Sequence, residues 1–141
     1  MTLTADDRFA ILDVLAAANR AADEKDVAGM MAWYAEGSSI EGDMQASGDR
    51  SAFAEGLETI FQNEPGLKRH IGSGHLFEAE GDKAVVRSLL TVFEGDDAPT
   101  LVATADIRDE LVREDGGWRI ARHVVTMDPG TKAAMAAARA G

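Results

Sequence analysis

The spacing of the apolar residues changes at Leu67, and this change constrains the fold more than any other feature of the chain. Before Leu67, apolar residues recur every three or four positions, which is typical of one face of a helix. After Leu67 they alternate with polar residues, which is typical of strands in a sheet. Glycine- and aspartate-rich turn signals separate four strand-like runs: 67–79, 83–94, 100–114 and 118–127. Runs of this length joined by short turns predict a strongly bent antiparallel sheet that follows a helical N-terminal part.

The N-terminal part contains three predicted helices. Thr4, Asp26 and Asp49 each precede an apolar pattern of helical period, and their side chains suit the N-cap position. The expected elements are helices over 4–25 and 26–34, a short strand over 38–41, and a third helix from Asp49 to Pro65.

One domain of mixed α and β structure accounts for the whole chain. With 141 residues, of which 45% are hydrophobic, the chain is long enough for one core and too short for two ordinary domains. We therefore assign residues 1–141 to a single α+β domain, in which the alanine-rich tail 131–141 forms a frayed helix. In 84–86 and 89–90 both faces of the strand are apolar. Because the helices can cover only one face, we expect a second copy of the chain on the other, in a homodimer or a trimer.

The charge balance excludes several classes of partner. Fourteen Lys and Arg residues against 25 Asp and Glu residues leave a net charge of −11 at pH 7, which repels phosphate backbones and anionic lipid surfaces. We therefore expect neither nucleic acid nor a membrane among the partners. The N-terminal sequence has neither the basic start nor the apolar segment of a signal peptide, which favours a cytoplasmic location.

Metal and thiol chemistry are not expected. The chain has no cysteine, which excludes disulfides, thiolate catalysis and cysteine-type zinc sites. His70, His75 and His123 do not have the HxH or HxxxH spacing of metal ligands, so we expect no metal and no cofactor. On regular strands His75 points away from His70, and His123 points away from the apolar face of its strand. We interpret both as structural, although a bulge at 72–74 would reverse His75.

Asp23 is a candidate functional residue because of its place on the first helix. At 100° per residue it lies about 20° from Leu12 and from Ala16, inside the predicted apolar arc. A carboxylate that faces the core near a helix C-terminus needs a partner, since both burial and the helix dipole disfavour its charge. The alternative is that Asp23 turns to solvent or caps local backbone groups.

His70 is the expected partner of Asp23. It shares a strand face with Gly72 and Gly74, and a face of one histidine and two glycines leaves the volume of a cavity wall. A hydrogen bond from one ring nitrogen to Asp23 would leave the other free to take a proton. The alternative is a structural histidine with satisfied hydrogen bonds. The predicted pocket is lined by Leu12, Ala16, Asn19, Asp23, His70 and residues of the last two strands.

Four further residues are candidates for binding a ligand. Asn19 is expected to donate a hydrogen bond to a ligand oxygen, or to hold the nearby carboxylate in place. Arg122 is expected either at the pocket mouth, where it would bind an anionic group, or in a salt bridge with Asp109 or another carboxylate. Trp33 and Tyr34 are expected to pack between the second helix and the sheet, where either can line the pocket.

The order of elements, helix, helix, short strand, helix and four long strands, is that of the nuclear transport factor 2-like fold. Within that superfamily the chain resembles the SnoaL-like branch, and five segments carry this resemblance. The segments are AADEKD at 21–26, KRH at 68–70, GDKA at 81–84, RDELVR at 108–113 and GGWRI at 116–120.

This resemblance implies a cone-shaped, strongly bent antiparallel sheet wrapped around the N-terminal helices, a cystatin-like roll. Members of the superfamily include dehydratases, a dehydrochlorinase, isomerases, epoxide hydrolases and polyketide cyclases, and also proteins without catalysis, so the fold does not give the reaction. In the dehydratase and dehydrochlorinase branches an Asp from the first helix pairs with a His on the first long strand, and Asp23 and His70 match these positions. Ala18 stands where relatives often have a tyrosine that faces the pocket; Tyr34 is the only tyrosine here.

Two functions follow from these observations. The first is a small lyase or isomerase that uses no cofactor, in which His70 removes a proton from a mostly apolar cyclic ligand, Asp23 orients His70, and Arg122 or Asn19 stabilises the developing charge. The second is a non-catalytic module of the same fold that binds a small ligand or a second subunit. Ala18 favours the second hypothesis and the Asp23–His70 pair favours the first. An open cavity would distinguish the enzyme from a module whose cone is filled.

Overall fold

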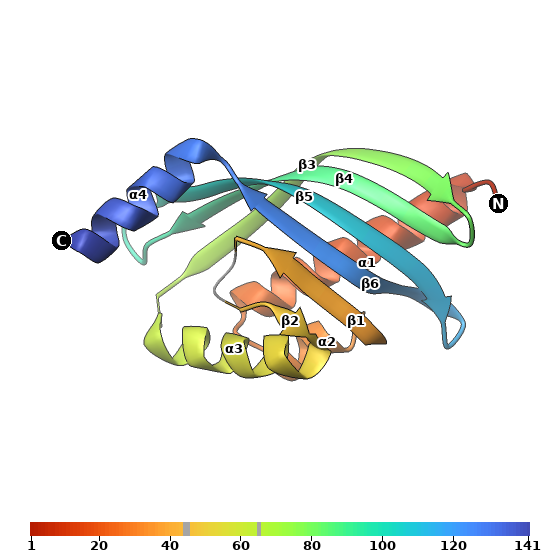
Figure 1. Ribbon diagram of the computed structural model, residues 1–141, viewed down its shortest axis with the longest axis horizontal. Helices are drawn as coiled ribbons and strands as arrows, with labels where there is room; N and C mark the ends of the chain where they lie inside the picture. The colour runs from red at the N-terminus through yellow and green to blue at the C-terminus, as the bar shows by residue number, and fades with distance from the viewer. Residues whose placement is uncertain (44–45, 65) are drawn as a thin grey trace.

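The computed structural model describes residues 1–43, 46–64 and 66–141. Four helices and six strands make up this part of the chain (Figure 1). In chain order they are α1 Ala5–Asp23, α2 Val27–Met31, β1 Tyr34–Gly42, β2 Gly48–Asp49, α3 Arg50–Asn63, β3 Lys68–Glu80, β4 Lys83–Glu94, β5 Thr100–Glu114, β6 Gly117–Met127 and α4 Pro129–Ala140.

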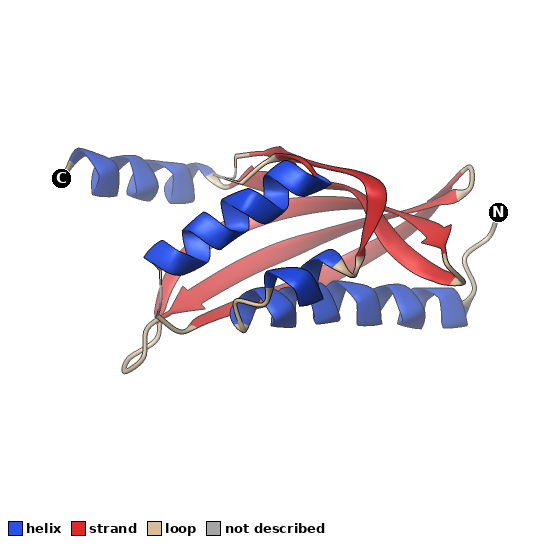
Figure 2. Ribbon diagram, turned by 90° about the horizontal axis from the view of Figure 1, so that it is seen from below, coloured by secondary structure: helices blue, strands red, loops and turns tan. Residues whose placement is uncertain are grey.

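The six strands form one curled sheet in the order β2-β1-β6-β5-β4-β3. The four long strands pair antiparallel as hairpin neighbours, as predicted, and β1 joins the other side of β6 in parallel. Helices α1, α2 and α3 gather on one side of the curled sheet, and α4 extends from its end (Figures 1 and 2). The predicted α+β cone is therefore confirmed, with one parallel pair that the sequence pattern did not indicate.

The helix caps are those predicted. Thr4 accepts a hydrogen bond from the backbone of Asp7, whose carboxylate accepts one from the backbone of Thr4, so the two form a capping box. Asp26 and Asp49 cap α2 and α3 through the backbone N–H groups of residues 29 and 52. These side chains satisfy N–H groups that a helix start leaves without partners.

The predicted second helix was too long. It ends at Met31, and Tyr34 already begins β1, which extends to Gly42 rather than covering only 38–41. The backbone N–H of Ile120 donates to the carbonyl of Trp33 at 2.9 Å, so the chain enters the sheet earlier than its helical spacing indicated. Strand β2 was not predicted, because two residues are too short to show a period.

The core lies between the helices and the concave face of the sheet. Its fully buried large side chains come from α1, α3 and the strands: Ile11, Phe53, Ile40, Leu111, Ile120 and Val86. The predicted apolar arc of α1 was wrong in part, since Phe9 is 68% exposed and Ala16 is also exposed. The buried face of α1 is Ile11, Val14, Leu15, Ala18, Ala21 and Ala22. This face is rotated from the predicted one.

The helix predicted for the C-terminal tail is α4, which begins at Pro129 rather than at residue 131. The Thr131 hydroxyl accepts from the backbone N–H of Thr104 at 2.9 Å and donates to its carbonyl at 3.2 Å, which fixes the start of α4 to β5. The Lys132 ammonium lies 3.3 Å from the carboxylate of Asp43, which follows β1. Among the residues that the structure describes, no helix is both long and apolar enough to cross a membrane.

The end of β1 provides a test of the parallel β1–β6 pairing. Gly42 has φ +113°, and a Cβ at this position would lie 1.9 Å from the Val125 carbonyl oxygen. We expect Gly42→Ala to lower the free energy of unfolding by roughly 1–3 kcal/mol or more, since it adds backbone strain and a clash. Gly37→Ala in the same strand is the control, because a Cβ there meets nothing within 4 Å. Equal denaturation midpoints for the two variants in urea would contradict this account.

Candidate active site

A cavity of about 670 Å³ lies between the helices and the concave face of the sheet. Most of its lining is apolar and comes from α1, α3, β4, β5 and α4. Polar side chains interrupt this lining at a few positions, among them Asn19, Tyr34, His70, His75, Asp109 and His123. The cone is therefore open, and all three histidines of the chain line it.

Asp23 and His70 form a hydrogen-bonded pair at the cavity wall. The His70 Nδ1 atom lies 2.6 Å from Asp23 Oδ1. The backbone N–H of His70 also donates to Asp23, at 3.0 Å to Oδ1 and 3.3 Å to Oδ2. The carboxylate thus holds the ring and the backbone of His70 together, and Nε2 is the nitrogen left for a ligand. The Asp23 side chain is only 11% exposed, and it lies behind His70 rather than in the cavity lining.

The reason for this pairing differs from the one predicted. Asp23 is the last residue of α1 and lies outside its buried face, on the flank of the helix that is next to β3. Asn19, one turn earlier, is on the same flank and lines the cavity as expected. Leu12 and Ala16 do not line it; Leu15, Ala18 and Ala22 do.

His75 faces the cavity because β3 contains a bulge. The register of β3 against β4 shifts between Ser73 and Leu76, and Gly74 in the bulge has φ +62°. One extra residue reverses the alternation of side chains, so His75 and Phe77 turn to the side of His70. The orientation expected for His75 on a regular strand was therefore wrong, and the cause is the bulge that the glycines at 72 and 74 had indicated as the alternative.

The side chains of Asn19 and His75 meet above Gly72. A Cβ at Gly72 would lie 3.5 Å from His75 Nε2 and 3.6 Å from Asn19 Nδ2. Neither side chain makes a hydrogen bond within the described residues. Two polar nitrogens thus lie within van der Waals reach of this position, next to His70.

His123 and Asp109 form a second pair on another wall. The His123 Nδ1 atom lies 2.6 Å from Asp109 Oδ1, and the Asp109 side chain is 4% exposed. His123 was expected to be structural, but both residues line the cavity. The register of β5 against β6 shifts between Glu110 and Leu111, so that Leu111 pairs with Ile120 and Asp109 with His123. Counting back from the turn without this bulge would pair Asp109 with Arg122.

Tyr34 lies beside this second pair. Its ring meets the His123 ring edge to face, with centroids 6.2 Å apart. Burial, and in addition the charge of Asp109, raise the pKa of Tyr34 well above its usual value of 10. The hydroxyl therefore keeps its proton at neutral pH and can act as a donor.

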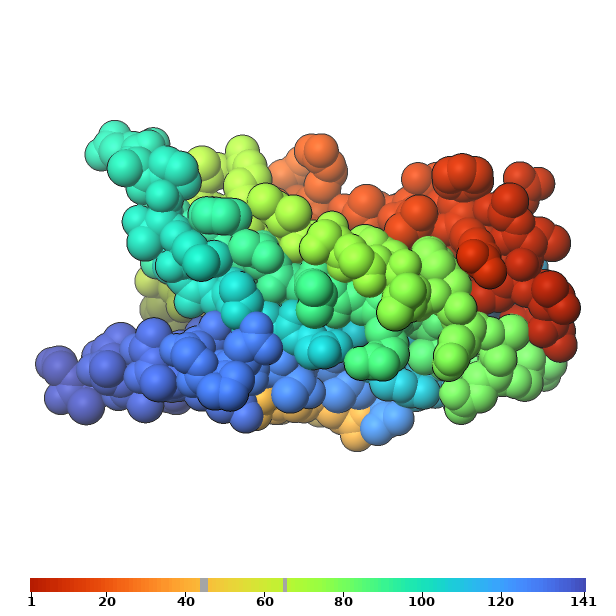
Figure 3. All heavy atoms as spheres, turned by 90° about the horizontal axis from the view of Figure 1, so that it is seen from above, coloured from red at the N-terminus to blue at the C-terminus, as the bar shows by residue number. Residues whose placement is uncertain are grey.

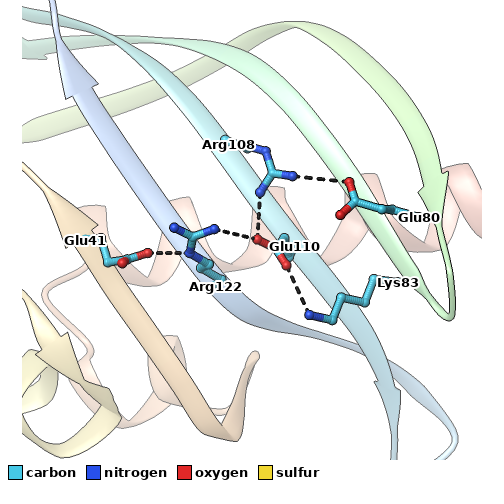
Figure 4. Close-up of polar contacts among 6 residues, drawn as sticks. All are labelled: Glu41, Glu80, Lys83, Arg108, Glu110 and Arg122. Carbon is cyan, nitrogen blue, oxygen red and sulfur yellow. Dashed lines mark hydrogen bonds and ion pairs between the residues drawn. The ribbon is translucent and has the colours of Figure 1, made fainter.

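Arg122 and Trp33 do not line the cavity. The bulge turns Arg122 to the outer face of the sheet, where it forms ion pairs with Glu41 and with Glu110, the latter at 3.0 Å (Figure 4). Of the two roles expected for Arg122, the structure shows the salt bridge and not the place at the pocket mouth, and the carboxylates are Glu41 and Glu110 rather than Asp109. Trp33 packs at the edge of the core, with the Arg119 guanidinium 5.4 Å from the centre of its ring.

Glu110 is the centre of this outer cluster. Its carboxylate accepts hydrogen bonds from Arg108 at 2.6 Å, from Arg122 at 3.0 Å and from Lys83 at 3.2 Å (Figure 4). Burial raises the pKa of Glu110, but these hydrogen bonds from Arg122, Arg108 and Lys83 lower it by more, to about 2 from 4.5. In the described part of the chain, no group of three or more His, Cys, Asp or Glu side chains could hold a metal ion.

The chain is similar in sequence to one domain family. The sequence profile of the SnoaL-like domain matches residues 3–124. A search of curated proteins found no match.

Solved structures show the same fold. A protein of unknown function with a cystatin-like fold from Nostoc punctiforme PCC 73102 is 23% identical, with a TM-score of 0.80 over 92% of this chain and 96% of that one. ActVI-ORFA from Streptomyces coelicolor is 22% identical, with a TM-score of 0.77 over 86% and 97%. A protein from Novosphingobium aromaticivorans DSM 12444, provisionally named a scytalone dehydratase, is 17% identical, with a TM-score of 0.72 over 86% and 83%. At these identities the likeness concerns the fold alone.

The outer cluster predicts a specific dependence of stability on pH. Because the pKa of Glu110 is about 2 in the folded state and about 4.5 when unfolded, its contribution is fully present above pH 4.5 and is lost as the pH falls through 2. Such a shift corresponds to at most roughly 3 kcal/mol. We expect Glu110→Gln to lower the free energy of unfolding at pH 7 and to flatten its decline between pH 4.5 and 2.

Glu80→Gln is the matched control, since the Glu80 side chain is 62% exposed and its pair with Arg108 is longer, at 3.4 Å. We expect it to change stability by less than about 1 kcal/mol. Urea denaturation at several pH values measures both variants. A decline with pH in Glu110→Gln as steep as that of the wild type would contradict the assignment.

Proposed function

This chain belongs to the SnoaL-like domain family, and on that premise we propose that it is a lyase or isomerase that needs no cofactor. In this proposal His70 is the general base for a small, mostly apolar cyclic ligand. The observation that carries the proposal is the 2.6 Å contact between His70 Nδ1 and Asp23, with His70 at the wall of an open cavity. A histidine with one nitrogen held by a carboxylate presents the other as a proton acceptor.

In this proposal Asp23 positions the ring of His70. It is almost buried, and it accepts from both the ring and the backbone of His70, so the ring cannot rotate without loss of a hydrogen bond. When Nε2 takes a proton from a ligand, the carboxylate stabilises the positive charge that forms on the ring. No nucleophile is needed for this step, and none of the chemistry requires a metal.

Asn19 and His75 are proposed to hold an oxygen of the ligand. Removal of a proton from carbon is easiest next to a carbonyl group, because the charge moves to the oxygen, where a donor can stabilise it. Asn19 Nδ2 and His75 Nε2 lie above Gly72, two residues from His70. In this proposal Asn19 and His75 stabilise the developing charge, which Arg122 was expected to do.

The apolar lining indicates the rest of the ligand. Residues of α1, α3, β4, β5 and α4 provide most of the apolar surface, and the Asp109 carboxylate in the lining already has a histidine partner. A neutral cyclic ketone or alcohol fits such a wall better than an anion does. The name of the scytalone dehydratase neighbour, which denotes a lyase, is consistent with this class of reaction.

The alternative, a module without catalysis, has less support. It rests on Ala18, which lines the cavity without a polar group. A filled cone would have favoured it, whereas the cavity is open and has a paired histidine at its wall. Tyr34, in β1, brings to the cavity a hydroxyl that α1 lacks.

We further propose that two copies associate through the outer face of the sheet. Ile71 and Leu76 alternate with cavity residues of β3 and are 48% and 67% exposed. In Figure 3, β3, β4 and β5 form the middle of the visible surface, between α1 and α4. Association would remove this apolar surface from water.

We expect light scattering after gel filtration to give twice the mass of the chain, 15.0 kDa, at micromolar concentration. Leu76→Lys places a charge in the proposed contact and should shift the protein towards the monomer. Lys132→Ala, on α4, should not. A wild-type monomer would rule out the association.

The catalytic proposal is tested with cyclic ketones in D₂O. We expect the wild type to accelerate exchange of hydrogen for deuterium next to the carbonyl group, as followed by proton NMR. His70→Gln and Asp23→Asn should each reduce the rate by about 100-fold or more, and the double variant should be little slower than either. Glu24→Gln, beside Asp23 but without a contact to His70, is the control. Additive losses would show that the two residues act independently, and full activity in His70→Gln would refute the general base.

A further inference from the structure

The proposed function depends on how the end of α1 meets β3, and a second contact joins the same two segments. The Lys25 ammonium donates to the carbonyl oxygen of Gly66 at 2.7 Å, in a partly buried position. Lys25 follows Asp23 by two residues, and Gly66 precedes His70 by four. The end of α1 and the start of β3 are thus joined twice, once through the Asp23–His70 pair and once through Lys25.

Lys25 has a backbone conformation that is unusual for a lysine. Its φ is +58°, in the left-handed region that favours glycine. Its N–H donates to the carbonyl of Ala22 at 3.0 Å, and the N–H of Asp26 donates to that of Ala21 at 2.9 Å. These two bonds form the Schellman motif that ends many helices, in which glycine is the usual residue at this position. What the lysine adds, at the expense of backbone strain, is the hydrogen bond to Gly66.

Strand β3 is at the edge of the sheet, so in the described part of the chain one side of its backbone has no neighbouring strand. Side chains from the end of α1 provide partners there. Asp23 accepts from the backbone N–H of His70 at 3.0 Å, and Lys25 donates to the carbonyl of Gly66. The end of α1 therefore takes part of the place that a seventh strand would have beside β3.

The segment that Lys25 contacts is also held from its other side. The backbone N–H of Leu67 donates to the Asp96 carboxylate at 3.1 Å, and the Leu67 carbonyl accepts from the N–H of Gly95 at 3.0 Å. Both partners belong to the connection between β4 and β5. Lys25 thus joins α1 to a segment that is already attached to the sheet, and this limits how far the end of α1 can move from β3.

We propose that Lys25 is a positioning residue for the proton transfer: it fixes the start of β3 against the end of α1, so that the Asp23 carboxylate stays in contact with His70. The inference rests on the proposed function, because it concerns the same pair. Lys25 does not line the cavity, so it acts through His70 and not on the ligand. Backbone strain kept for such a purpose is a known feature of functional sites.

The test measures deuterium exchange of 1-tetralone beside its carbonyl group, followed by proton NMR in D₂O. We expect Lys25→Met, which keeps the stem and removes the ammonium, to lower the exchange rate at saturating ketone by about 10-fold, since small displacements of a catalytic group slow a reaction strongly. The ketone concentration that gives half the maximal rate should change little, because Lys25 is not in the cavity lining. Lys25→Arg keeps a donor for the Gly66 carbonyl and should restore most of the rate.

Two glycine variants separate the hydrogen bond from the strained backbone. Lys25→Gly removes the ammonium but suits the left-handed conformation, so it should fold and lose exchange as Lys25→Met does. Asp115→Gly is the matched control. Asp115 lies between β5 and β6 with φ +54° and is not in the cavity lining, so this change relieves the same conformation elsewhere and should leave the exchange rate unchanged.

A measurement on the free protein examines the pair without a ligand. In ¹⁵N NMR of the neutral His70 ring, the wild type should carry the proton on Nδ1, which faces Asp23. Lys25→Met and Lys25→Gly should show a mixture of the two tautomers, and Lys25→Arg should show that of the wild type. A merely structural role of Lys25 would lower stability without changing the tautomer.

The outcomes distinguish this inference from the proposed function. Exchange and tautomer like those of the wild type in Lys25→Met and Lys25→Gly would overturn the role of Lys25 alone. An equal loss of exchange in Lys25→Arg would also contradict it, because that variant keeps a donor. If the wild type does not exchange 1-tetralone, His70 as general base is refuted, and the tautomer of His70 in the variants still decides whether Lys25 positions the pair.

Discussion

Two β-bulges determine which side chains of the long sheet face the cavity, and the site depends on them. The bulge in β3 turns His75 inward, and the shift between β5 and β6 turns His123 inward and Arg122 outward. Each inserts one residue, and in a structure with a period of two that is enough to exchange the faces of a strand. The bulge between β5 and β6 places His123 beside Asp109 in the cavity and Arg122 beside Glu110 on the outer face. Both clusters therefore depend on the same register shift.

Burial then determines how the charges are arranged. A carboxylate away from water needs a partner, and Asp23, Asp109 and Glu110 each have one or more within hydrogen-bond distance. Asp23 and Asp109 have a single histidine partner each, at the cavity wall. Glu110 on the outer face has permanently charged partners and supports stability instead. The protein thus separates the Asp–His pairs from the network of Arg and Lys ion pairs by the face of the sheet on which they lie.

Helix α1 contributes both packing surface and polar side chains to the site. Alanine makes up half of the buried face of α1, and the flank of the helix presents Asn19 and Asp23 to β3. Asn19 and His75 meet above Gly72. Small residues thus occur on both elements, alanines on α1 and Gly72 on the strand beside it.

The sequence by itself determined the fold class and the local elements, because these follow from periodicity, caps and turn residues that act over a few positions. It correctly predicted the caps, the four long strands and the proximity of Asp23 and His70. It could not determine the end of α2, the parallel pairing of β1 with β6, or the inward orientation of His75 and His123. Those depend on the register between strands, and one inserted residue changes the register without altering the pattern of either strand. Only the tertiary structure decides between two such registers, because the choice depends on packing across the whole sheet.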